Sequence, residues 1–279
     1  MVAVLNFETI KISCCLLKKP FMKKILCALL LSCIFVFTAC IETTSETSID
    51  AKGGGKLSVV MDMGKLFDLM KMVGKDPAET MKGETSKDSV FNFKDKIAEI
   101  EKDQGRPLTA DEKALIDKTT GRVEMNLEKK MMRITINSEF TKLSQLSMFQ
   151  EIQKMAMNKP PMDDEKAEGE QAEKAMEFAE KPSKAMSFNA KDGLIENVYD
   201  KTKYEMSPED EAALGQIDQV KPMLGDMPMT LVYKLPRPVK NVTAGAKYEL
   251  SEDKKTVTIK YDLLDTFKDP SVQAYKIEY

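Results

Sequence analysis

The sequence predicts an α+β domain with a mainly antiparallel sheet of about six to eight strands and with helices packed on one face. Two observations favour this class. Segments whose apolar residues alternate at period two come in pairs joined by short polar turns. Single helical segments separate these pairs, and the last third of the chain holds several runs of β-branched and aromatic residues.

The first half of the domain is expected to mix strands with short helices. In order, the expected elements are a strand at 56–63, a short helix around 66–72, a loop at 75–89, helices around 91–103 and 110–118, and a hairpin of strands at 123–127 and 132–136. The second of the two neighbouring helices has a clear start, because Thr109 and Glu112 have the spacing of a capping box.

The second half is expected to end in strands. In order, the expected elements are a helix at about 143–157, an acidic insertion near 158–184, strands at 185–190 and 194–200, a helix from 208 to 224, and strands at 230–233, 256–261 and 274–277. Asp192-Gly193 is a good hairpin turn. Ser207 followed by Pro208 is typical of a helix start. The acidic insertion is interpreted as a solvated helix or a disordered segment.

The N-terminus resembles a bacterial lipoprotein signal peptide. Met22 and the basic pair Lys23-Lys24 precede an apolar stretch, and the small residues Thr38-Ala39 stand directly before Cys40. We therefore expect residues 1–39 to be a cleaved leader, of which 1–21 come from a start codon assigned too early.

Two alternatives for this leader stay open. Cleavage before Cys33 also fits the pattern, but it would leave the apolar run Ile34–Phe37 at the new terminus. An uncleaved membrane helix over Ile25–Ile41 would have 17 residues, which is the lower limit for spanning a bilayer. Cleavage before Cys40 is the preferred interpretation.

Cys40 is the expected lipidation site. It would carry a diacylglycerol thioether and an N-linked acyl chain such as palmitate, and several chains hold a protein at a membrane where one does not. Ile41 follows, instead of the aspartate that retains many lipoproteins in the inner membrane, so the outer membrane of a Gram-negative cell envelope is favoured. Residues 40–55 are expected to include a flexible tether, because they are rich in Ser, Thr and Gly.

Composition excludes several kinds of site. All five cysteines lie in the leader or at the anchor position, so the rest of the chain has no thiol for a disulfide, a zinc–thiolate site or a nucleophile. The chain has no histidine, which excludes Ser-His-Asp triads and imidazole bases. Beyond the leader, 37 basic and 44 acidic residues remain, and this acidic balance disfavours nucleic acid as a partner.

Four segments occur in an order that matters more than any single motif. A glycine-led strand at Gly53–Met63 precedes a hairpin that ends in Glu139–Leu143, a late strand leads into Tyr233–Val239, and a polar turn opens the strand within Leu250–Thr258. This order resembles the LppM-type lipoproteins of unknown function, over most of the mature chain. The resemblance implies an α+β domain whose concave face accepts lipid, and it implies no catalytic residue.

Methionine is frequent, with 20 residues in the chain. Four Met-x-Met pairs occur: Met61/Met63, Met70/Met72, Met155/Met157 and Met227/Met229. Their main interpretation is adaptable filling of the core. A deformable apolar pocket and a Cu(I) site of soft thioethers are the alternatives. We expect no bound metal and no cofactor.

A hydrophobic pocket is predicted in the gap between helices and sheet. The side chains expected to line it project from two amphipathic helices. They are Leu66, Phe67, Met70, Phe149, Ile152 and Met155. The alternative is that these residues only pack against one another.

These observations predict a single α+β domain at 56–279 that is held at the cell envelope by a lipid anchor. We expect it to be non-enzymatic and to bind a hydrophobic ligand, such as a lipid, or another envelope protein. One alternative is a structural or assembly lipoprotein with no pocket. The other is a hydrolase that uses only carboxylates, which would require two acidic residues to converge in a cleft.

Overall fold

The computed structural model describes residues 42–72, 76–81, 83–150 and 170–279. Cys40 to Tyr279 form one compact unit. The expected leader and the lipidation site at Cys40 lie outside the described residues. In the part of the chain that is described, no helix is both long and apolar enough to cross a membrane.

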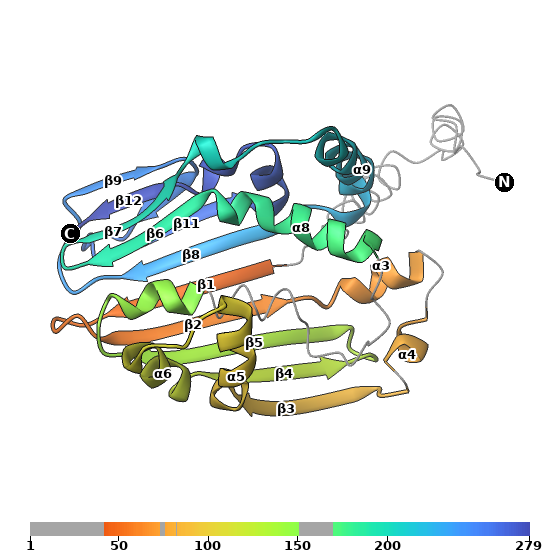
Figure 1. Cartoon of the computed structure of the whole chain (residues 1–279), viewed down its shortest axis with the longest axis horizontal. Helices are drawn as coiled ribbons and strands as arrows, with labels where there is room; N and C mark the ends of the chain where they lie inside the picture. The colour runs from red at the N-terminus through yellow and green to blue at the C-terminus, as the bar shows by residue number, and fades with distance from the viewer. Residues whose placement is uncertain (1–41, 73–75, 82, 151–169) are drawn as a thin grey trace, which may run out of the picture. The chain divides into compact units, whose positions relative to one another are not determined.

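The main element is an eight-stranded sheet, seen across the middle of Figure 1. Its strands, in spatial order, are β10 (Lys247–Leu250), β11 (Thr256–Asp262), β8 (Pro228–Lys234), β1 (Glu42–Ile49), β2 (Gly55–Asp62), β5 (Met131–Phe140), β4 (Thr120–Asn126) and β3 (Ser86–Asn92). All neighbouring strands run antiparallel except β1 and β8, which are parallel. The predicted fold class, α+β with a mainly antiparallel sheet, is therefore confirmed.

The prediction of a flexible tether at 40–55 is wrong for residues 42–49. These residues form β1, which lies at the centre of the sheet between β2 and β8. The segment contains few large apolar residues, so its pattern indicated a linker. Threonine nevertheless favours strands because it is β-branched, and Thr43 and Thr47 are buried on the inner face of the sheet.

A second sheet has four antiparallel strands. Its order is β6 (Met186–Lys191), β7 (Leu194–Tyr199), β12 (Tyr275–Glu278) and β9 (Asn241–Ala244). The predicted hairpin of β6 and β7 is confirmed, and Gly193 in its turn has a φ of 79°, a left-handed conformation that glycine adopts without strain. The four strands of this sheet come from three separate parts of the chain, the β6–β7 hairpin, β9 and β12.

The helices are short except for two. The α-helices are α3 (Leu66–Met72), α4 (Pro77–Thr80), α5 (Ile97–Gln104), α6 (Ala110–Asp117), α8 (Glu170–Lys184) and α9 (Pro208–Leu224). Single helical turns are η1 (Phe93–Lys96), η2 (Lys201–Lys203), η3 (Leu263–Phe267) and η4 (Pro270–Gln273). In Figure 1, α5, α6 and α8 all lie on the viewer's side of the large sheet.

Several predicted elements are confirmed and others need correction. The capping boxes at Thr109 and Ser207 start α6 and α9 as expected. The expected loop at 75–89 is wrong in part, because it contains α4 and the start of edge strand β3. The acidic insertion contains α8 from Glu170 onward, and its first part, 158–169, lies outside the described residues. Helix α8 is not purely solvated, since Phe178 is buried and stacks on Phe267 at 5.1 Å between ring centroids.

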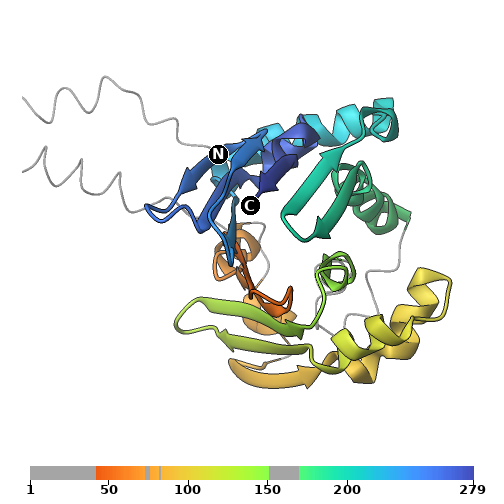
Figure 2. The same cartoon turned by 90° about the vertical axis from the view of Figure 1, so that its left-hand side faces the viewer.

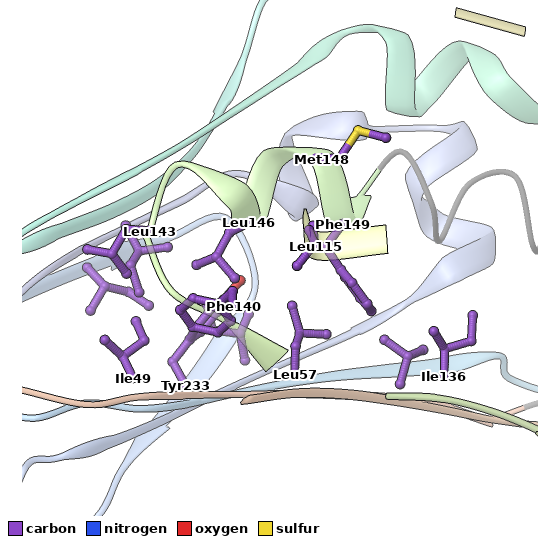
Figure 3. Close-up of a cluster of buried hydrophobic side chains, with 14 of the residues drawn as sticks. Ile49, Leu57, Leu115, Ile136, Phe140, Leu143, Leu146, Met148, Phe149 and Tyr233 are labelled. Carbon is purple, nitrogen blue, oxygen red and sulfur yellow. The ribbon is translucent and has the colours of Figure 1, made fainter. Parts of the chain in front are cut away.

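The core lies between the large sheet and the elements on its inner face. Inward side chains of β2 and β5, such as Val59 and Ile136, have no exposed surface. A helical segment at 145–150 packs over them, and Figure 3 shows Leu146 and Phe149 from this segment pointing toward Leu57 on the sheet. In Figure 2 the same segment, in light green, lies between the β6–β7 hairpin and the half of the large sheet formed by β3, β4 and β5.

The N-terminus of α6 holds a charge pair that makes stability depend on pH. Arg106 donates two hydrogen bonds to the Glu112 carboxylate, at 2.9 and 2.6 Å, and the backbone of Thr109 donates another at 2.7 Å. The hydrogen bonds from Arg106 lower the pKa of Glu112 from 4.5 to about 2. A folded-state pKa below the unfolded value means that this stabilisation is present above pH 4.5 and is lost as the pH falls toward 2.

Glu112→Gln is therefore expected to lower the free energy of unfolding at neutral pH by about 1–3 kcal/mol. The difference between variant and wild type should shrink as the pH falls below about 4. Urea unfolding across this pH range measures it. Glu139→Gln, in an exposed pair with Lys56 at 3.1 Å, is the control and should change stability by no more than about 0.5 kcal/mol. If the difference in the free energy of unfolding between Glu112→Gln and wild type stays constant as the pH falls toward 2, the lowered pKa of Glu112 is contradicted.

Candidate functional site

A cavity of about 360 Å³ lies between the two sheets, which is within the usual range for small-molecule sites. Its walls come from β1, β2, β8 and β11 of the large sheet, from β6, β7 and β12 of the small one, and from the helical elements that join or cover them. The lining residues are Ser45, Thr47, Leu57, Leu146, Phe149, Gln150, Ala179, Glu180, Pro182, Ser183, Met186, Phe188, Asn197, Met229, Leu231, Tyr233, Tyr261, Leu263, Thr266, Phe267, Gln273 and Tyr275.

The floor of the cavity is set by strand register. Ser45 on β1 pairs with Leu231 on β8, which pairs with Ile259 on β11, so side chains of these rows share the inner face. Thr47 and Tyr233 form the next row toward the end of β1. The small side chains of Ser45 and Thr47 on β1 leave space on the inner face of the sheet. The larger side chains of β8 lie next to them.

The opposite wall includes the last turns of α8. Ala179, Pro182 and Ser183 line the cavity from this helix. Helix α8 is held in place by the stacking of Phe178 on Phe267 and by an ion pair between Lys181 and the buried carboxylate of Asp210 on α9. These contacts fix the helix without filling the space next to the sheets.

Three tyrosines of the lining remain neutral. Burial raises the pKa of Tyr233 to about 12. Burial also raises the pKa values of Tyr261 and Tyr275, because removal from water disfavours the negatively charged phenolate. The hydroxyls of Tyr233 and Tyr275 are hydrogen-bonded to each other across the two sheets, and their rings lie 5.6 Å apart between centroids. All three hydroxyls therefore act as hydrogen-bonding groups and not as bases.

The other polar groups of the cavity are amides and hydroxyls. Asn197 donates through Nδ2 to the backbone carbonyl of Gln273 at 2.9 Å, which leaves its side-chain oxygen as an acceptor. Thr266 donates to the backbone carbonyl of Leu263 at 2.6 Å. Glu180 is the one charged residue among the described lining residues, and its carboxylate forms an ion pair with Lys184 at 2.8 Å. The described lining thus combines apolar side chains with many uncharged hydroxyl and amide groups and with the paired carboxylate of Glu180.

Of the six residues predicted to form a pocket, the structure places Phe149 in the cavity. Phe67 and Met70 pack elsewhere, so the prediction that one pocket contains them is wrong. They come from α3, which lies at the end of the sheet and packs beside β4 and β5. Leu66 belongs to α3, but its side chain is not among the described ones. Ile152 and Met155 lie outside the described residues.

Phe67 belongs to a separate methionine-rich cluster. Its buried members are Phe67, Met70, Met81, Met125 and Met132, with Met63 and Leu127 packed against them. Met125 and Met132 face each other across β4 and β5. These methionines fill the space between two short helices and the sheet, which agrees with adaptable core packing. Within the described ranges, no group of three or more His, Cys, Asp or Glu residues is arranged for a metal ion.

The tyrosines were missed as site residues, although the sequence carried part of the signal. Met229, Leu231 and Tyr233 alternate along one predicted strand, and Val257, Ile259 and Tyr261 alternate along another. Period two places each set on one face of its strand. It does not show that β12 brings Tyr275 against Tyr233 from a second sheet, because that contact joins positions 42 residues apart.

No protein-family model matches the chain, and no curated protein matches it. Among solved structures, the chain resembles the folded domain of LppM from Mycobacterium tuberculosis, determined by NMR. The alignment covers 87% of this chain and 91% of that one, with 7% sequence identity and a TM-score of 0.33. A likeness of this size assigns neither a family nor a function to the chain.

Proposed function

We propose that this protein is a lipid-anchored lipoprotein of the cell envelope that binds a hydrophobic ligand in the cavity between its two sheets, without catalysing a reaction. The observation that carries the proposal is the cavity itself, about 360 Å³ with mainly apolar walls. A space of this volume between two sheets, with apolar walls and several polar groups, is the usual form of a small-molecule site. A space lined by Phe149, Leu231 and Met229 suits an acyl chain or another apolar group.

The position of the cavity relative to the expected anchor supports a membrane-derived ligand. Glu42 begins β1 only two residues after Cys40, so chain geometry limits the distance between them to about 7 Å. Thr43, the next residue of β1, pairs with Met229, and Met229 pairs with Tyr261. Met229 and Tyr261 line the cavity. The lining therefore extends to the end of the sheet at which the acylated cysteine would hold the domain close to the bilayer.

The alternatives require features of a different kind. An assembly lipoprotein would bind no small molecule, and the cavity between the two sheets would hold only water. A hydrolase that uses only carboxylates needs two acidic residues at one site. Among the described residues of the lining, Glu180 is the single carboxylate, and it is paired with Lys184. Ligand binding is therefore the function that this arrangement supports best.

Mass spectrometry of the protein purified from bacterial membranes tests both parts of the proposal. Under denaturing conditions, the expected mass is that of residues 40–279 with the acyl groups on Cys40. Under native conditions, an additional non-covalent mass is expected from a co-purified apolar molecule, and it should disappear on extraction with organic solvent. An unmodified N-terminus would overturn the anchor. Protein that carries no additional mass from several expression hosts would overturn the ligand and favour the assembly role.

A further inference from the structure

We infer that the ligand of this cavity is an uncharged amphiphile, in which an apolar chain or ring carries hydroxyl, ether or amide groups. Anionic fatty acids and phosphate-bearing head groups are excluded from the cavity by the same reasoning. The inference rests on the proposed function and defines the chemical class of its ligand.

The first step concerns charge. An ionised carboxylate or phosphate loses its hydration in a buried site and requires a cation or several strong donors in return. No lysine or arginine occurs among the described residues that line the cavity. The two lysines at the end of α8 are already engaged, Lys181 with Asp210 and Lys184 with Glu180. The one charged group among the described lining residues, the carboxylate of Glu180, offers no cation to an anionic ligand.

The second step concerns the hydrogen bonds that the lining offers. Two protons belong to the hydroxyl pair of Tyr233 and Tyr275, and only one of them can lie between the two oxygens. The other proton is left to donate. In the described part of the chain, the hydroxyl of Tyr261 forms no hydrogen bond to another protein group, and burial raises the pKa of Tyr261, so this group keeps its proton. These are neutral donors for an oxygen atom of a ligand.

The third step adds an acceptor. The side-chain oxygen of Asn197 is not used in its bond to Gln273, so it can accept a hydrogen bond from a hydroxyl or an amide. Uncharged donors and an acceptor beside a large apolar surface match the two parts of a neutral amphiphile. They match an anion poorly, because a few neutral donors without a cation do not offset the cost of removing a charged group from water.

Displacement of the uncharged fluorescent probe N-phenylnaphthylamine tests the inference on the chain from Cys40 onward, with Cys40→Ala. Decanol, decanoate and decylamine serve as competitors with equal chains and different charges. Decanol is expected to bind at least about tenfold more tightly than decanoate at neutral pH. The affinity for decanoate should rise as the pH falls toward its carboxyl pKa, because the protonated acid is neutral. Equal displacement by decanol and decanoate at neutral pH would overturn the inference while leaving the proposed function intact.

A tyrosine variant tests the role of the hydroxyl. Tyr261→Phe is expected to weaken decanol about two- to tenfold, the effect of one hydrogen bond, and to leave the affinity for the probe unchanged. Tyr248→Phe, on edge strand β10 outside the cavity lining, is the matched control and should change neither affinity. If Tyr261→Phe leaves the affinity for decanol unchanged, the donor assigned to Tyr261 is overturned. Absence of probe binding by the parent chain would instead remove the proposed function itself.

Discussion

A chain that begins at residue 50 is expected to lose cooperative folding, because this truncation removes β1 from the centre of the large sheet. β1 pairs with β2 from Glu42 to Ile49 and with β8 from Thr43 to Ser48. Each ladder hydrogen bond contributes a net 0.5–1.5 kcal/mol or so. Loss of both ladders, together with buried Ile49, therefore matches or exceeds the roughly 5–15 kcal/mol by which a domain is stable.

Near-ultraviolet circular dichroism and thermal unfolding of the truncated chain measure this effect. The control is a chain that begins at Cys40, which lacks the leader and keeps the compact unit from Cys40 to Tyr279. The control should unfold in one sharp transition, whereas the shorter chain should show none and should expose the edges of β2 and β8 to aggregation. A sharp transition at the same temperature in both chains would contradict the position of β1 in the sheet.

Ser45→Trp is expected to lower the affinity for N-phenylnaphthylamine at least about tenfold, because the indole ring would occupy the ligand's space. Ser45 lies on the floor of the cavity at the centre of the large sheet. A large side chain there enters open space of about 360 Å³, so it does not require the surrounding core to move. The stability of the folded protein should therefore change much less than its affinity for N-phenylnaphthylamine.

Thr44→Trp is the matched control for this variant. Thr44 is the preceding residue of the same strand and its side chain points to the opposite face of the sheet. The two variants share the added ring, the strand and the β-propensity of the new residue, and they differ only in the face that they occupy. Fluorescence titration of both proteins, with thermal unfolding as a check on folding, separates the two effects. Equal affinity of both variants for the probe would show that the probe binds elsewhere.

Local elements of this fold could be predicted where the sequence contains its own boundary signals. The β4–β5 hairpin has strict alternation on both strands, and its turn is formed by charged residues. Helix α9 has Ser207 at its cap and Gly225 after its end. In such segments short-range hydrogen bonds and burial of one face favour the same conformation. Tertiary contacts therefore stabilise the conformation that the local sequence already favours.

β1 and the pocket residues show where this kind of prediction fails. The sequence of β1 is that of a linker in isolation, and it becomes a strand because β2 and β8 supply partners on both sides. Phe67 and Phe149 both lie on apolar helix faces, but one packs at the end of the sheet and the other beside the cavity. Helical periodicity identifies a buried face and does not identify what covers it.

The sequence by itself determined which kinds of site are excluded by composition. It also determined the leader pattern and most of the helices and strands in the second half of the domain. These follow from composition and from interactions between residues that are close in the chain. Only the tertiary structure decided the site, since the parallel pairing of β1 with β8 joins Thr43 to Met229, and the second sheet brings Tyr275 to Tyr233. Alternation places a side chain on one face of its strand, but the neighbouring strand is chosen by packing across the whole domain.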